Sequence, residues 1–184
     1  VEQDELRPAL IRGKDFPRNI QSLATDQKNL YIGMKDEVGC YSFATSDYQV
    51  ISHPEFFYIS TLMLDSSENT LWIGNARHLH RMNLDTKEIE RVRDFYVVKS
   101  IAKDDNNLLI GTDNGLYVCD RQGTWHLISH DARNSQSLSS NVVNMFFKDA
   151  NGNIWIGTDN GISLAAHNPS IRSRSLFDIT GSDE

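Results

Sequence analysis

Residues 143–164, VNMFFKDANGNIWIGTDNGISL, contain the pattern that decides the fold. An apolar run is followed by a polar turn at 149–153, a second apolar run at 154–157 and a turn at 159–161. The dipeptide Asn160-Gly161 is a strong hairpin signal, because a type I′ turn needs positive φ at both central residues. The stretch therefore predicts three short β-strands that are joined by tight turns.

The same order of segments recurs along the chain, with copies that begin near residues 20, 59, 98 and 143. A repeat of about 40 residues also occurs in helical arrays. Segments such as Leu71-Trp72-Ile73 are too short and too rich in β-forming residues for helices. One glycine follows the second strand of every copy, at Gly33, Gly74, Gly111 and Gly157.

A further extended segment follows the first three strands in each copy. These segments are 48–51, 88–92 and 125–128, and residues 175–179 are expected to serve the last copy. Three hairpin-linked strands and a fourth form one blade of a β-propeller. We therefore expect an all-β fold with four repeats of four-stranded antiparallel sheets, in a single domain over residues 1–184.

The number of repeats indicates a partial propeller. Propellers generally have 4–8 blades, so four repeats stand at the lower limit and fit an excerpt from a longer array. Residues 6–11 form a candidate outer strand ahead of the first copy. The equivalent positions Tyr31, Trp72, Leu109 and Trp155 are expected to pack between neighbouring blades.

Composition excludes several partners. The formal net charge is −7, and an acidic surface repels nucleic acid and anionic membranes, so we expect no nucleic acid and no membrane contact by this segment. The chain contains no run of 18 apolar residues. Cys40 and Cys119 occupy different places in their repeats, which favours two free thiols over a disulfide.

No catalytic constellation is evident, and we expect no catalytic residue, no metal and no cofactor. His78 and His80 share one face of a strand and could form two legs of a metal site. A third ligand is not evident nearby in sequence, so a solvated strand face is the favoured interpretation. The aspartates that precede the first turn of each copy, Asp26, Asp65, Asp104 and Asp149, are expected to cap that turn.

Ligand binding is expected on the loops between blades, because loops on a rigid scaffold commonly carry function. Aromatic rings beside cationic groups suit a sugar, which binds by stacking and polar contacts. The candidate ligand-binding residues are Phe57, Tyr58, Arg77, His78 and Tyr96. The alternative is that Phe57 and Tyr58 begin an inner strand and pack in the core.

The last copy carries a family resemblance. Ser137-Leu138-Ser139-Ser140-Asn141, followed by VVNMFFKDANGNIWIGTDNGI, resembles the two-component regulator propeller repeat, and the resemblance extends over roughly residues 20–166. It implies the periplasmic sensor region of a Bacteroidetes hybrid two-component receptor. In such receptors propellers of usually seven blades precede a β-sandwich, a transmembrane helix and a histidine kinase. The implied ligands are fragments of complex polysaccharides.

We therefore expect a non-enzymatic, periplasmic sensor domain that recognises an oligosaccharide, with the kinase elsewhere in the receptor. Expected partners are the ligand, neighbouring blades or domains, and a second copy in a homodimer. One alternative is a protein-interaction scaffold. Another is a propeller lyase or glycosidase, although the sequence nominates no pair of carboxylates about 5–10 Å apart for a glycosidase.

Overall fold

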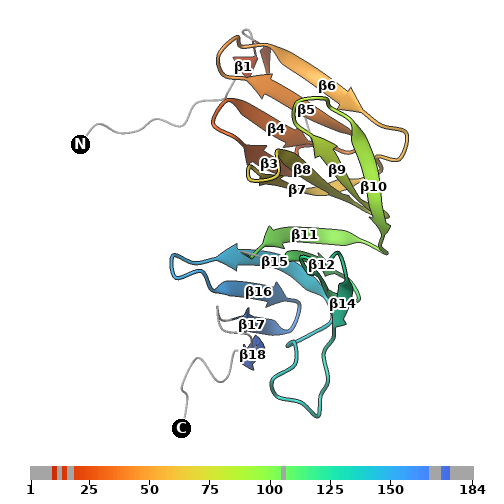
Figure 1. Ribbon diagram of the computed structural model, residues 1–184, viewed down its shortest axis with the longest axis vertical. Coiled ribbons are helices and arrows are strands. Elements are labelled where there is room, and N and C mark those ends of the chain that lie inside the picture. The colour runs from red at the N-terminus through yellow and green to blue at the C-terminus, as the bar shows by residue number, and fades with distance from the viewer. Residues whose placement is uncertain (1–9, 12–13, 16–18, 105–106, 166–170, 175–184) are drawn as a thin grey trace, which may run out of the picture.

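The described residues form four four-stranded antiparallel sheets and one two-stranded sheet (Figure 1). The computed structural model describes residues 10–11, 14–15, 19–104, 107–165 and 171–174. Every regular secondary-structure element in these ranges is a β-strand. Each of the four sheets has four strands that follow one another as a meander, which confirms the expected all-β fold of four propeller blades.

The strands of the four sheets follow chain order. The first sheet contains β3 (Ser22–Thr25), β4 (Asn29–Gly33), β5 (Glu37–Ser42) and β6 (Tyr48–Ser52). The second contains β7 (Ile59–Asp65), β8 (Thr70–Asn75), β9 (His78–Asn83) and β10 (Ile89–Asp94). The third contains β11 (Val98–Lys103), β12 (Leu108–Thr112), β13 (Gly115–Cys119) and β14 (Trp125–Ile128). The fourth contains β15 (Val143–Lys148), β16 (Ile154–Thr158), β17 (Gly161–Ala165) and β18 (Ile171–Arg174).

Two expectations at the chain ends need correction. The fourth strand of the last sheet is β18, which pairs with β17, whereas the expected segment 175–179 lies outside the described residues. At the other end, residues 6–9 of the expected outer strand lie outside the described residues, and β1 (Leu10–Ile11) pairs with β2 (Lys14–Asp15) in a separate two-stranded sheet. Because β1 and β2 are close in the sequence, the two strands form their backbone hydrogen bonds with each other.

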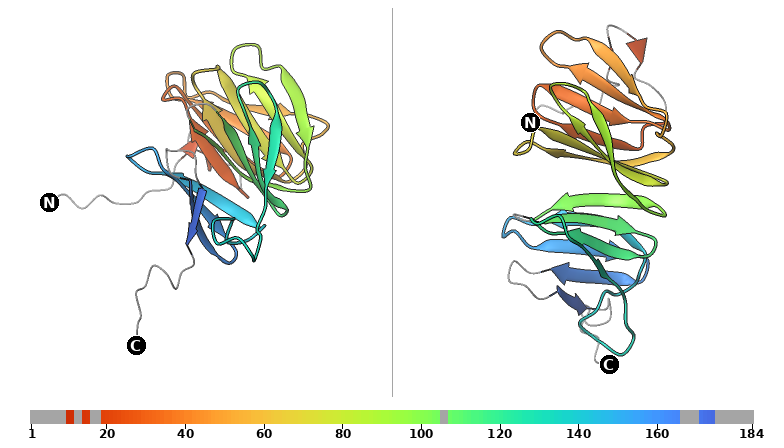
Figure 2. Two further views of the ribbon diagram at one scale, coloured as in Figure 1. Left: turned by 60° about the horizontal axis from the view of Figure 1, so that its bottom comes forward. Right: turned by 45° about the vertical axis from the view of Figure 1, so that its right-hand side comes forward.

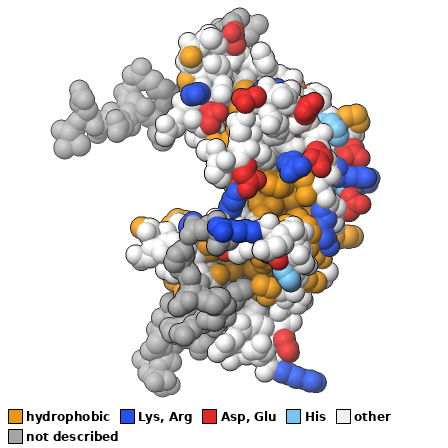
Figure 3. Space-filling model, viewed as in Figure 1, with side chains coloured by type: hydrophobic (Ala, Val, Ile, Leu, Met, Phe, Trp, Pro, Cys, Tyr) orange, Lys and Arg blue, Asp and Glu red, His pale blue; other side chains and the backbone are white. Residues whose placement is uncertain are grey.

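The sheets are arranged as an open arc around their innermost strands. Strands β3, β7, β11 and β15 neighbour one another in that order, and the first and fourth sheets lie at opposite ends (Figures 1 and 2). The space-filling view shows that the arc is hollowed on one side (Figure 3). The architecture is thus a partial propeller.

Apolar cores lie between neighbouring sheets. Tyr31 belongs to the core between the first and second sheets, and Trp72 to the core between the second and third sheets. Leu109 belongs to the core between the third and fourth sheets, and all three side chains are buried. These three confirm the expected packing between blades. Trp155, at the same position of the fourth sheet, is only half-buried. No further sheet within the described residues packs on its outer face.

Aspartates form the expected caps of the first turn in each sheet. Asp149 Oδ1 accepts hydrogen bonds from the backbone N–H groups of Asn151 and Asn153, both at 2.9 Å. Asp26 Oδ1 accepts the N–H of Asn29 at 2.6 Å, and Asp104 Oδ1 accepts that of Asn107 at 2.7 Å. A side-chain carboxylate that satisfies free N–H groups stabilises a tight turn.

The meander brings two kinds of connection to one end of every sheet. The second strand and the fourth strand both end there, so the β8–β9 turn and the β6–β7 and β10–β11 connections lie at the same rim. We call this rim the loop face. The turns that follow the first strand lie at the opposite end.

Candidate functional site

Four loops on the loop face around the first two sheets are linked by backbone hydrogen bonds. Ile59 N–H donates to the Lys35 carbonyl at 2.9 Å, and Ala76 N–H donates to the Phe57 carbonyl at 3.1 Å. Phe95 N–H donates to the Arg77 carbonyl at 2.8 Å. These backbone bonds fix the positions of the residues that the sequence nominated for ligand binding.

Phe57 and Tyr58 form an exposed aromatic pair. Their ring centroids are 4.9 Å apart, the rings are nearly perpendicular, and the side chains are 43% and 53% exposed. The guanidinium carbon of Arg77 lies 5.2 Å from the centre of the Phe57 ring, and Lys35 Nζ lies 5.2 Å from the centre of the Tyr58 ring. A cation over each ring keeps polar donors beside an apolar surface.

The core alternative for Phe57 and Tyr58 is wrong. Strand β7 begins at Ile59, which is buried, and the phenylalanine that enters the core is Phe56, at 5% exposure. Tyr58 has φ of 51°, a left-handed backbone conformation that is unusual for a bulky residue. This conformation separates the outward-facing Tyr58 from the inward-facing Ile59.

The remaining nominated residues lie nearby but differ in their surroundings. Tyr96 is 82% exposed in the β10–β11 connection, next to Phe95, which is bonded to Arg77. His78 is half-buried at the start of β9, and its Nδ1 lies 3.0 Å from Asp94 Oδ1. Its ring centroid is 5.7 Å from that of His80, so His78 lies beside His80 rather than beside the aromatic pair. We use the name histidine cluster for His53, Glu55 and His80, which lie close together.

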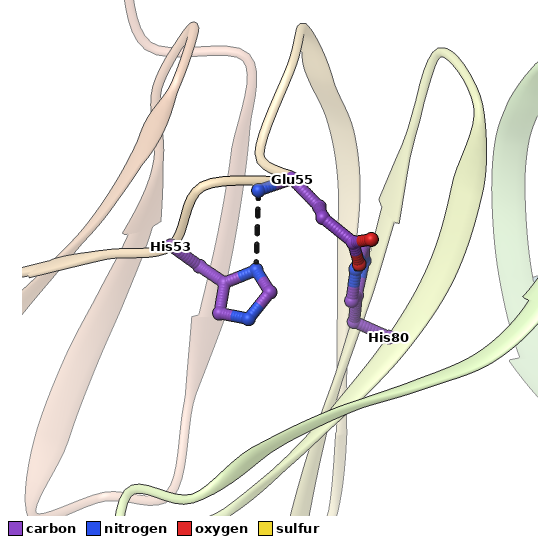
Figure 4. Close-up of side chains that lie close together, drawn as sticks. All are labelled: His53, Glu55 and His80. Atoms are coloured by element: carbon purple, nitrogen blue, oxygen red, sulfur yellow. Dashed lines mark hydrogen bonds and ion pairs between the residues drawn. The ribbon is translucent and has the colours of Figure 1, made fainter.

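The histidine cluster contradicts the expected solvated strand face. His80 is completely buried, and its Nε2 lies 3.2 Å from Glu55 Oε2. His53 lies in the same connection as Glu55, and its Nδ1 accepts the Glu55 backbone N–H at 3.3 Å (Figure 4). One ligand atom from each of His53, Glu55 and His80 lies within 4.8 Å of the others. The group contains His80 of the expected histidine pair but not His78, and its other two members come from the β6–β7 connection, where Glu55 precedes His80 by 25 residues.

Charge around the cluster is balanced. Arg91 Nη1 lies 3.2 Å from Glu55 Oε1, which is the carboxylate oxygen that does not pair with His80. The hydrogen bond from His80 holds the pKa of Glu55 below its ordinary value, and the Arg91 charge adds to this effect. Burial lowers the pKa of His80 despite the opposing effect of Glu55, so the imidazole is neutral at pH 7.

A second candidate region lies at the end opposite the loop face. An open cleft of about 520 Å³ lies between the second and third sheets, and its lining includes Asp65, Trp72, Lys103 and Arg121. Trp72 Nε1 is buried there without a hydrogen-bond partner among the described residues. The cleft is open and mixed in charge, and it contains none of the nominated residues.

Together, the four fanned sheets and the loop face define the class of the chain as a partial β-propeller. A family model described as "Two component regulator propeller" matches residues 137–160. The chain therefore carries this repeat, as the resemblance predicts. No curated protein matches the chain. Among the described residues, no helix is long and apolar enough to cross a membrane.

Solved structures resemble the chain over most of its length. The extracellular domain of the putative hybrid two component system BT4673 from B. thetaiotaomicron is 32% identical, with a TM-score of 0.74 over 91% of this chain and 25% of that chain. The extracellular domain of BT3049 from the same organism is 18% identical, with a TM-score of 0.68 over 91% and 24%, a likeness of fold alone.

The chain is thus similar to part of the extracellular domains of Bacteroides two-component systems. The chain spans about a quarter of the length of those domains. The similarity confirms the expected β-propeller fold and the expected two-component regulator propeller repeat.

Proposed function

We propose that the chain is the ligand-recognition part of a periplasmic sensor region in a two-component receptor, and that its loop face binds polysaccharide fragments. The observation that carries this proposal is the exposed Phe57–Tyr58 pair with Arg77 and Lys35 beside it. Sugar rings stack their C–H faces on aromatic rings, while their hydroxyl groups bind charged and polar side chains. In this proposal Tyr96, in the β10–β11 connection, and His78, at the start of β9, supply further contacts on the same loop face.

Backbone strain supports a functional role for Tyr58. A bulky residue at φ of 51° costs about 1 kcal/mol or more, and such strain persists where the surrounding structure imposes it. The next residue, Ile59, is held by the hydrogen bond from its N–H to the Lys35 carbonyl and by its burial in the core. The aromatic pair is thus held outward before a ligand arrives, which reduces the entropy lost on binding.

Signalling would follow from a change in domain or dimer geometry that the ligand favours. In this proposal the partners are the neighbouring blades and domains of the receptor and a second copy of it, and a histidine kinase elsewhere in the receptor transmits the signal. The chain itself performs no catalysis.

Calorimetric titration with a panel of polysaccharide fragments tests the proposal. We expect one fragment to bind the full sensor region, and we expect Phe57→Ala with Tyr58→Ala to weaken that binding about tenfold or more, because two stacking rings are lost. Phe43→Ala is the matched control, since Phe43 is an exposed aromatic, at 50%, on the β5–β6 turn away from the loop face.

Several outcomes would contradict the proposal. If no fragment binds the full sensor region, carbohydrate recognition is wrong. If binding survives the double variant but is lost in Arg121→Ala, the ligand occupies the cleft at the opposite end. Release of shortened products from any fragment would identify an enzyme instead.

The scaffold alternative has one observation in its favour. Met145 and Phe147, on β15 of the fourth sheet, are 61% and 65% exposed. Large apolar side chains that share one face of a terminal sheet can dock another protein. This surface is distinct from the loop face, so the two functions can be tested separately.

A further inference from the structure

We propose that His53, Glu55 and His80 form a binding site for a divalent transition-metal ion of the Zn²⁺ type. Imidazole nitrogen and carboxylate oxygen are ligands that Zn²⁺ uses in proteins. One such atom from each side chain lies within 4.8 Å of the other two. In a tetrahedral site with bonds of about 2.0–2.2 Å the ligand atoms stand about 3.5 Å apart, so a closure of about 1 Å forms the site.

The ligands are held in place by groups around them. The Glu55 carbonyl accepts a hydrogen bond from Asn75 Nδ2 at 3.0 Å, which ties the connection to the second sheet. The buried Phe56 ring meets the His80 ring edge to face, with centroids 5.6 Å apart, and meets the His53 ring at 5.4 Å. Packing of this kind limits rotation of both imidazoles and favours coordination without large rearrangement.

A second observation concerns the two ring nitrogens of His80. Nδ1 of His80 is buried and has no hydrogen-bond partner among the described residues, while Nε2 faces Glu55. Buried imidazoles normally satisfy both ring nitrogens, and an unsatisfied one is costly. Either nitrogen of a neutral imidazole can bind a metal. The unpartnered Nδ1 can therefore carry the ring proton, which leaves Nε2, the nitrogen that faces Glu55, available to bind an ion.

The metal would compete with interactions that exist without it. The hydrogen bond between His80 and Glu55 would give way to metal–ligand bonds, and the single proton of the neutral His80 ring would move from Nε2 to Nδ1 so that Nε2 can bind the ion. Arg91 would remain on Oε1 of Glu55 as the outer partner that orients the carboxylate, and at 48% exposure its charge is screened by water. The described residues offer three ligands in this group, so water would occupy the fourth position.

The position of the site gives it a structural consequence. His53 and Glu55 belong to the β6–β7 connection, whereas His80 is a residue of β9 in the second sheet. A metal ion would therefore link the β6–β7 connection to β9 of the second sheet. The same connection presents Phe57 and Tyr58, although the metal site stands independently of any sugar binding there.

Titration of the chain with Zn²⁺ by calorimetry, and with Co²⁺ by visible absorption, tests the site. We expect one Zn²⁺ ion per chain and Co²⁺ bands typical of low coordination number. His53→Gln and Glu55→Gln should each weaken Zn²⁺ binding about tenfold or more, because each removes a direct ligand. His126→Gln is the matched control: His126 is an exposed histidine that pairs with Asp120 on another sheet, and its loss should leave Zn²⁺ affinity unchanged.

A second measurement keeps the test decisive if a variant is unstable. Zn²⁺ should raise the melting temperature of the unmodified chain and of His126→Gln, but not that of folded His53→Gln, because a ligand that binds only the native state stabilises it. Absence of Zn²⁺ binding by the unmodified chain would overturn the site. Binding that persists in both His53→Gln and Glu55→Gln would overturn it as well, since the ion would then sit elsewhere.

Discussion

The aspartates at the first turn of each sheet, which include Asp65 and Asp149, have different partners in different sheets. In the fourth sheet Asp149 Oδ2 accepts the indole N–H of Trp155 at 3.0 Å. In the second sheet Asp65 instead forms an ion pair with Lys103 of β11, and the indole N–H of Trp72 is left without a partner among the described residues. Asp65 therefore joins the second and third sheets in addition to capping its own turn.

The ion pair predicts a pH-dependent stability. Burial raises the pKa of Asp65, but the hydrogen bonds from Lys103 and Ser67 outweigh this effect and the net pKa is lowered. A lowered carboxyl pKa contributes stability that is present above the unfolded-state value of about 4 and is lost as pH falls through the folded-state value. Asp65→Asn should therefore reduce the free energy of unfolding by about 1–3 kcal/mol at pH 7 and by less at pH 3.

Urea unfolding followed by tryptophan fluorescence at both pH values measures this difference. Asp36→Asn is a suitable control, because Asp36 is 47% exposed at 3.8 Å from Lys35, and an exposed pair contributes about 1 kcal/mol at most. A loss of stability for Asp65→Asn that is equal at pH 7 and pH 3 would show that the ion pair contributes nothing.

Glycines on the second strands allow neighbouring sheets to approach closely. A Cβ atom placed on Gly74 would collide with Val98 of the third sheet and lie 2.7 Å from Thr61 Cγ2. At Gly157, the equivalent position of the fourth sheet, a Cβ would meet only Met145, at 2.8 Å from its Cγ. Met145 is 61% exposed and can turn away.

Substitution of the two glycines should therefore have unequal effects. Gly74→Ala forces a methyl group between two packed sheets and should lower the free energy of unfolding by about 1–3 kcal/mol. Gly157→Ala should cost less than about 1 kcal/mol, because no sheet in the described residues packs beyond it. Chemical denaturation of both variants measures the difference. Equal losses would mean that the glycines serve the strand itself rather than the contact between sheets.

The open arc exposes the outer face of its last sheet. Met145 and Phe147 share this face with the half-buried Trp155, which elsewhere in the repeat would be covered by the next sheet. An apolar face of this kind promotes association. We expect the isolated chain to form dimers or larger species as its concentration rises, and we expect Met145→Lys with Phe147→Lys to make it monomeric.

Light scattering during size-exclusion chromatography measures the change in mass. Tyr96→Lys is the control, because Tyr96 is 82% exposed but lies on the loop face rather than on the terminal sheet. Association that the double lysine variant does not reduce would assign the contact to another surface.

The repeated strands and turns could be predicted from the order of residues along the chain. A hairpin at Asn160-Gly161 and a capped turn at Asp149 depend on groups within about five residues of one another, so their hydrogen bonds are encoded locally. The buried positions of Tyr31 and Trp72 follow equally from the two-residue period of a strand and from recurrence in successive copies.

The candidate sites required the tertiary structure. Sequence periodicity placed His78 and His80 on one face of a strand, but only the stacking of the second sheet against the β6–β7 connection brings Glu55 and His53 to His80 and buries it. In the same way, the left-handed conformation of Tyr58 separates this exposed side chain from the buried Ile59 that begins β7. Local spacing determines strands and turns because their bonds are short-range. Contacts between segments that lie 25 residues apart depend on how whole sheets pack, and single-residue patterns do not encode that packing.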